Sequence, residues 1–111
     1  MDIRDNYTYL LAIQQKIEHS YKYHLKISEL ARSADVSISK LEHDFRSYFG
    51  HNLRDYQTKI RIVNAKKLLE TKLPIKRIAL EIGYSSGESF ARIFKKSTGH
   101  TPSVYRKNLT D

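Results

Sequence analysis

The sequence of 111 residues contains no cysteine and no tryptophan. Without cysteine, disulfides, thiol catalysis and thiolate zinc sites are excluded, and the cytoplasm is the expected compartment. No apolar run approaches the roughly 20 residues that a membrane-spanning helix needs, so no membrane partner is predicted. Only four glycines and two prolines interrupt the chain. Hydrophobic residues make up 40% of it, enough for one compact domain or two very small subdomains that share a core.

Positive charge is abundant but unevenly placed. The net charge is +8. Residues 1–50 hold seven Lys/Arg and seven Asp/Glu, whereas residues 51–111 hold thirteen Lys/Arg and five Asp/Glu. A basic excess of this kind favours a polyanionic partner, nucleic acid first and an anionic membrane surface second. The alternative interpretation of the same charge is a solvated surface without a ligand.

Apolar residues recur at helical spacing and no stretch alternates as a strand does, so the sequence predicts an all-α fold of about seven helices. The first helix is expected over residues 6–22, a short second helix follows, and Gly50 ends the third. A longer helix over residues 53–70, capped by Asn52, forms a rod of about 27 Å. Pro74 is expected in the first turn of the next helix, Ser85 or Ser86 caps another, and Thr101-Pro102 opens the last.

An internal repeat runs through the chain. Residues Phe45, Gly50, His51 and Tyr56 recur 49 positions later as Phe94, Gly99, His100 and Tyr105. Upstream the offset is 48, as in Ala31 with Ala79. Each copy therefore reads as a short helix, a tight turn and a longer helix, which is the helix-turn-helix unit. Gly83 in the second turn permits a positive φ, and Asp35 in the first tolerates one.

The segment IALEIGYSSGESFARIFKKSTGHTPSVYR, from Ile78 to Arg106, closely resembles the signature of AraC/XylS-type transcription regulators. Upstream, ISELARSADVSISKLEHDFRSYFG resembles the first helix-turn-helix of that family and YQTKIRIVNAKKLL its connecting helix. The resemblance implies two homeodomain-like subdomains, over residues 6–52 and 71–107, joined by a linker helix over 53–70.

The same resemblance implies sequence-specific binding to double-stranded DNA, with one recognition helix in each of two adjacent major grooves. Such grooves lie roughly 34 Å apart, which the linker rod and the two subdomain radii together can span. Regulation of transcription is implied, with activation expected. Gly87 and Ala91 depart from the family pattern, because a polar side chain is usual at both positions, and the departures weaken base reading by the second helix.

The outward residues of the two recognition helices are the candidates for DNA contact. If Leu41, Phe45 and Phe49 point inward, the base-reading candidates of the first helix are Ser39, Lys40, Glu42, His43 and Arg46. Those of the second helix are Ser86, Glu88, Ser89 and Arg92. The phosphate-contact candidates are Lys95, Lys96, Lys59, Lys66 and Lys76. Glu42 and Asp44 are expected to repel phosphates, which suits the first helix to sequence discrimination.

Three tyrosines, Tyr48, Tyr84 and Tyr105, are interpreted as core residues and not as base-stacking platforms. Arg106 is expected to pair with a carboxylate, Glu81. No metal or cofactor is predicted, because the histidines lack ligand spacing and both Gly-His pairs end helices.

No phosphate-binding glycine loop or nucleophile elbow is present, which argues against an enzyme. A non-specific architectural nucleic-acid binder and a protein-only helical adaptor remain as alternatives. The expected partners are double-stranded DNA and RNA polymerase. The chain is interpreted as an excised C-terminal domain that binds as a monomer, with dimerisation left to a missing domain of the parent protein.

Overall fold

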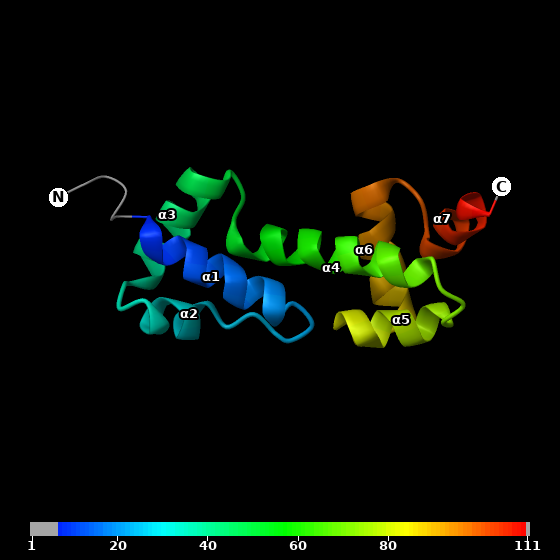
Figure 1. The fold of residues 1–111 in the computed structure, drawn as a ribbon, viewed down its shortest axis with the longest axis horizontal. Coiled ribbons are helices and arrows are strands. Elements are labelled where there is room, and N and C mark those ends of the chain that lie inside the picture. Colours follow the sequence, from blue (N-terminus) through cyan, green and yellow to red (C-terminus); the bar gives the residue numbers. More distant parts are fainter. Residues whose placement is uncertain (1–6, 111) are drawn as a thin grey trace. The chain divides into compact units, whose positions relative to one another are not determined.

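The computed structural model describes residues 7–110, and within that range every regular element is a helix. Figure 1 traces the seven helices in chain order. Their bounds are α1 Thr8–His19, α2 Ile27–Ser33, α3 Ile38–Phe49, α4 Leu53–Leu69, α5 Ile75–Ile82, α6 Gly87–Thr98 and α7 Pro102–Leu109. The predicted all-α fold of about seven helices is therefore confirmed. No helix in this described range has the length and hydropathy needed to cross a membrane.

The chain divides into two compact units within α4. The N-terminal unit extends to Thr58 and the C-terminal unit begins at Lys59. Helix α4 thus contributes its first turns to one unit and its remaining turns to the other. Residue 6, where the first subdomain was predicted to begin, lies outside the described residues.

The core of the N-terminal unit forms between α1, α3 and the start of α4. Leu10 and Ile13 of α1 are buried together with Leu41 and Phe45 of α3. The ring of Tyr56 in α4 lies 5.6 Å from the ring of Phe45 in an edge-on arrangement. The Tyr56 hydroxyl donates to Glu18 at 2.6 Å and accepts from Gln14 at 3.1 Å, so it fastens α4 to α1.

The core of the C-terminal unit repeats this plan. Ile78, Ala79 and Ile82 of α5 are buried against α6, where Phe90 and Phe94 have no exposed surface. Tyr105 of α7 places its ring 5.3 Å from that of Phe94, again edge-on. The tyrosine that follows each Gly-His pair therefore packs on the phenylalanine of its own unit.

Helix ends follow the capping residues that the sequence offers. The αL residues Gly50, Gly83 and Gly99 end α3, α5 and α6 at φ values of 78°, 110° and 87°. At the N-termini, Ser37, Asn52, Ser86 and Thr101 each accept a backbone N–H three residues further on. The caps expected at Asn52 and Thr101 are thus confirmed, and Ser86 rather than Ser85 caps α6.

Two predicted boundaries are wrong. Helix α1 ends at His19 and not at residue 22, because the N–H of Ser20 bonds the carbonyls of Lys16 and Ile17 and tightens the last turn. The connection after it is held by Gln57, whose amide donates to the carbonyls of Tyr21 and Tyr23 at 3.0 and 2.7 Å.

Pro74 is the N-cap of α5 and precedes its first turn, in contrast to the prediction. Its φ of −59° and ψ of 143° are extended, and it carries no side-chain cap. The difference of one residue follows from the Ile78 N–H, which bonds the Pro74 carbonyl and makes Ile75 the first helical residue.

Two side-chain predictions are also wrong. Tyr48 is 53% exposed, because it lies in the last turn of α3 and packs on Tyr7 and Phe49 at the surface instead of entering the core. Arg106 does not pair with Glu81, which accepts from Arg77 at 3.2 Å. Arg106 Nε instead donates to the Leu69 carbonyl at 3.1 Å. Leu69 is the last residue of α4, and a positive charge is stabilising at the C-terminal end of a helix. Tyr84 is buried as predicted, and Tyr105 is half-buried.

Candidate nucleic-acid interface

A helix-turn-helix occupies residues 27–49 of the N-terminal unit. Ala31 is buried in the middle of α2, where its small side chain lets α3 approach. The turn is closed by the Val36 N–H, which bonds the Ala31 carbonyl at 3.1 Å, and Asp35 adopts a φ of 56°. Ser37 then caps α3. The turn geometry and the cap together fix the direction in which α3 leaves α2.

Helix α3 buries one side and exposes the other. Leu41 and Phe45 have no exposed surface. The five base-reading candidates predicted on this helix are all exposed: Ser39, Lys40, Glu42, His43 and Arg46. Four of them, all but Lys40, fall on one arc at three- and four-residue spacing. Lys40 lies at the edge of that arc.

Asp44 is where the sequence interpretation of α3 fails. It was expected to repel phosphates, but it is only 6% exposed. Its Oδ2 accepts from the Tyr9 hydroxyl of α1 at 2.7 Å and from Lys40 Nζ at 2.9 Å. Burial raises the pKa of Asp44, but the hydrogen bonds from Tyr9 and Lys40 and the charge of Lys40 outweigh it, so the pKa lies below the ordinary value. Asp44 is thus a buried, compensated carboxylate.

The second helix-turn-helix occupies residues 75–98 of the C-terminal unit. Its turn follows the same hydrogen-bond plan, with the Tyr84 N–H bonding the Ala79 carbonyl at 2.9 Å. Gly83 supplies the positive φ that Asp35 supplies in the first copy. Near the start of α6, a Cβ added to Gly87 would lie 4.0 Å from the Lys76 Cα, an ordinary contact. The space at Gly87 would therefore admit a side chain.

On α6 the candidates separate into two groups. Glu88, Arg92, Lys95 and Lys96 are exposed. Ser86 and Ser89 are half-buried, and the Ser86 hydroxyl donates to that of Ser89 at 3.0 Å while also accepting the Ser89 N–H. The two serines thus hold the N-terminus of α6 together, and the outward face is formed by the charged residues.

The remaining phosphate-contact candidates differ in their surroundings. Lys59 and Lys76 are exposed. Lys66 is half-buried, and its Nζ lies 5.9 Å from the centre of the Tyr105 ring, at the outer limit of a cation–π contact. Its charge is thus partly engaged within its own unit.

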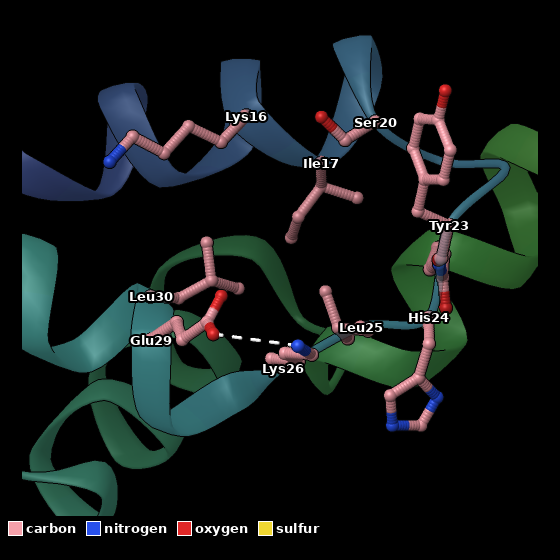
Figure 2. A pocket seen from close by; sticks show the side chains of 10 residues that line it. Lys16, Ile17, Ser20, Tyr23, His24, Leu25, Lys26, Glu29 and Leu30 are labelled. Atoms are coloured by element: carbon pink, nitrogen blue, oxygen red, sulfur yellow. Dashed lines mark hydrogen bonds and ion pairs between the residues drawn. The ribbon is translucent and has the colours of Figure 1, made fainter.

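A pocket of about 490 Å³ lies in the N-terminal unit between the end of α1 and the start of α2. Figure 2 shows Ile17, Leu25 and Leu30 around it and the Lys26–Glu29 ion pair, 3.6 Å long, at its side. None of the candidate DNA contacts lines this pocket. Among the described residues, no three His, Asp or Glu side chains gather as a metal site.

Known proteins resemble this chain in both sequence and structure. A family model described as a helix-turn-helix domain matches residues 30–108. The arabinose operon regulatory protein of Salmonella typhimurium is 34% identical over 96 residues, which cover 86% of this chain and 34% of that protein. The "Probable transcription factor PqrA" of Proteus vulgaris is 38% identical over 87 residues, which cover 78% and 71%.

Among solved structures, the C-terminal domain of AraT, a response regulator from Geobacillus stearothermophilus, aligns with a TM-score of 0.85 at 30% identity. That alignment covers 91% of this chain and 85% of the other. The chain spans about one third of the length of the arabinose operon regulatory protein it matches. The matched segment contains α3 and α6 together with the residues that cap them, Ser37, Gly50, Ser86 and Gly99. The chain therefore belongs to the AraC/XylS-type family of helix-turn-helix transcription regulators, as a DNA-binding domain and not an enzyme.

Proposed function

We propose that this domain binds double-stranded DNA sequence-specifically, with α3 and α6 in two successive major grooves, and that it thereby activates transcription. One observation carries the proposal: each unit holds a serine-capped helix that buries a phenylalanine core on one side and exposes polar and charged side chains on the other. A helix of this kind fits the major groove, whose base edges present distinct donor and acceptor patterns.

For α3 the proposed base readers are Ser39, Glu42, His43 and Arg46, which share its exposed arc. Arg46 suits guanine O6 and N7, and Glu42 suits the cytosine amino group. For α6, Arg92 is the principal reader, with Glu88 beside it. Lys40, Ser86 and Ser89 complete the proposed set, although each already forms a hydrogen bond within the protein.

Phosphate contacts are assigned to five lysines of the C-terminal unit: Lys59, Lys66, Lys76, Lys95 and Lys96. Such contacts release counterions and supply affinity without reading sequence. Because the basic excess lies after residue 50, the C-terminal unit would supply most of the salt-dependent affinity.

We also propose how many copies of the domain bind, which protein partner it has and in which compartment it acts. We expect it to bind as a monomer to an asymmetric site, since it contains two reading helices. RNA polymerase is the proposed protein partner, and the cytoplasm the proposed compartment. Since the chain spans about a third of the arabinose operon regulatory protein, a longer regulator would dimerise through a further domain.

Selection of bound duplexes from a random pool, followed by competition at two salt concentrations, tests the proposal. Arg92→Ala should relax preference at one base pair and cost about 1–3 kcal/mol on the selected duplex. The double variant Lys95→Ala, Lys96→Ala should weaken binding to the selected and the scrambled duplex equally. It should also reduce the slope of log affinity against log salt concentration by roughly two. Lys107→Ala removes one positive charge from an exposed position in α7 and is the control for Arg92→Ala, which also removes one.

Selection that yields no common sequence, with equal loss of affinity for every duplex as salt rises, would leave a non-specific architectural binder. Absence of duplex binding at low salt would favour a protein-only adaptor. Binding of this chain only as a symmetric dimer would overturn the monomeric mode.

A further inference from the structure

A polar network joins α1 to the buried side of α3. Asp44 of α3 accepts two hydrogen bonds on one oxygen, from the Tyr9 hydroxyl and from Lys40 Nζ. Tyr9 belongs to α1, 35 residues away in sequence. The Asp44 side chain is 8% exposed and that of Lys40 is 47% exposed, so the network begins in the interior and ends at the helix surface.

We propose that Asp44 and Tyr9 are positioning residues that set DNA specificity by restraining Lys40 on the recognition helix. The inference rests on the proposed function, since it takes α3 to be a reading helix. Among the base-reading candidates of α3, Lys40 donates to the buried carboxylate of Asp44. Tyr9 links that bond to α1, so the position of the ammonium is fixed by two helices.

The physical argument concerns the entropy of a long side chain. A free lysine loses much rotamer freedom when it binds, and this loss opposes association. The bond to Asp44 already restrains the Lys40 ammonium in the folded domain. An ammonium group has three donors, and the bond to Asp44 occupies one of them. Two donors therefore remain, in a fixed place at the edge of the reading arc, for a defined acceptor on DNA.

The same network limits non-specific attraction. The Asp44 charge lies 2.9 Å from the Lys40 ammonium and offsets its field. Free DNA phosphates would attract an unpaired lysine at any sequence. A paired, fixed lysine gains little from a misplaced phosphate but keeps its contact at a matching site. The expected consequence is a larger ratio of specific to non-specific affinity.

The second copy of the repeat shows that the helix-turn-helix does not require this network. At the offset of 49 residues, Lys40 corresponds to Ser89 and Asp44 to Ile93. Ser89 bonds Ser86 at the cap, and Ile93 carries no polar group. Helix α6 still packs and ends as α3 does. A helix-turn-helix in this chain therefore forms with or without such a network.

The test compares Asp44→Asn with the wild type on the selected and the scrambled duplex. The variant keeps the shape but loses the charge, so the Lys40 ammonium loses its ionic partner and is held less firmly. We expect affinity for the scrambled duplex to rise about threefold and affinity for the selected duplex to fall about threefold. The specificity ratio should thus fall about tenfold, which corresponds to about 1.4 kcal/mol. The salt slope on scrambled DNA should steepen by roughly one contact.

Two variants serve as controls. Asp35→Asn makes the same change in charge at an exposed turn whose φ of 56° suits asparagine. It should leave the ratio within twofold of the wild type. Tyr9→Phe removes only the bond from α1 to Asp44 and should give an intermediate fall in the ratio, which keeps the proposal testable if Asp44→Asn does not fold.

An unchanged ratio in folded Asp44→Asn, or a fall matched by Asp35→Asn, would overturn the proposal. A purely structural role would lower both affinities equally through the folded fraction and would leave the ratio and salt slope unchanged, which also overturns it. Failure of the proposed function is a different result, because the wild type itself would then show no preference between duplexes.

Discussion

The two units of this domain contain the same helix-turn-helix but differ in the side chains that pack beneath the second helix of the motif. Both pack a phenylalanine against a tyrosine edge, at 5.6 Å for Phe45 and Tyr56 and at 5.3 Å for Phe94 and Tyr105. The N-terminal unit then adds a buried carboxylate behind its recognition helix, whereas the C-terminal unit has Ile93 at the matching position.

From this difference we propose that α3 and α6 contribute differently to DNA binding. Residues 1–50 have no net charge, and Lys40 of α3 forms an ion pair with Asp44. On α6, Arg92, Lys95 and Lys96 are exposed within a half that carries the whole excess of +8. Discrimination would then come mainly from the N-terminal unit and affinity mainly from the C-terminal unit. The predictions below test whether the two units are as separate as this comparison requires.

The largest expected effect is loss of one unit at a time. Phe94→Ala should cost about 3–5 kcal/mol, because Phe94 is fully buried and a cavity replaces its ring. Amide exchange should show lost protection in α5 and α6 and retained protection in α1 to α3. Phe45→Ala should give the reverse pattern. Joint loss of protection in both units by either variant would show a single cooperative unit and break the comparison.

A smaller effect is expected at the turns. Gly83→Ala should cost about 1–2 kcal/mol, because Gly83 has a φ of 110° that an L side chain disfavours. Asp35→Gly, at a φ of 56°, should be neutral or slightly stabilising, since Asp35 already bears that strain. Urea denaturation midpoints measure both. A stabilising Gly83→Ala would contradict the prediction.

Removal of an N-cap side chain should cost less stability than the destabilising changes above. Ser37→Ala should cost about 1 kcal/mol through the lost bond to the Lys40 N–H. Ser86→Ala should cost somewhat more, because it also removes the hydroxyl bonded to Ser89. Thermal melts provide the measurement, and Ser97→Ala, exposed in α6, is the control. Equal effects of Ser97→Ala and Ser86→Ala would show that the cap contributes nothing.

The smallest effect is expected with acid. The pKa of Asp44 is lower in the folded protein than its ordinary value of 3.8, despite burial that raises it, because Tyr9 and Lys40 donate to it. Its contribution to stability is therefore present above that value and is lost as pH falls below it. Asp44→Asn should reduce the acid dependence of unfolding in the N-terminal unit only. Amide exchange at about pH 5 and about pH 3 measures this, and an unchanged dependence would contradict it.

Much of the fold followed from local patterns. Helical periodicity placed Phe45 and Phe94 in the core, and the spacing of Gly50 and Gly99 placed the helix ends. These predictions succeeded because caps and apolar stripes are satisfied within a few residues. The exposed arc of α3 was predictable for the same reason, since Leu41 and Phe45 define the opposite side.

Two of the wrong predictions, those for Asp44 and Arg106, concern partners far away in sequence. Asp44 was taken for an exposed acid because nothing near it signals Tyr9, which donates to it from 35 residues upstream. Arg106 was assigned to Glu81, but it bonds a backbone carbonyl 37 residues away, and no sequence pattern marks a carbonyl as free. One available signal was missed: Lys40 and Asp44 are four residues apart on a helix, a spacing at which opposite charges pair.

The sequence by itself therefore determined the helices, their caps, the duplication and the family, because each rests on short-range spacing or on residue identity. Tertiary structure decided that the Asp44 carboxylate is not available to DNA. The Tyr9 hydroxyl donates to Asp44 from α1, 35 residues away in sequence, and only 6% of Asp44 is exposed. Availability depends on the solvent and the partners around a side chain, and those are properties of packing.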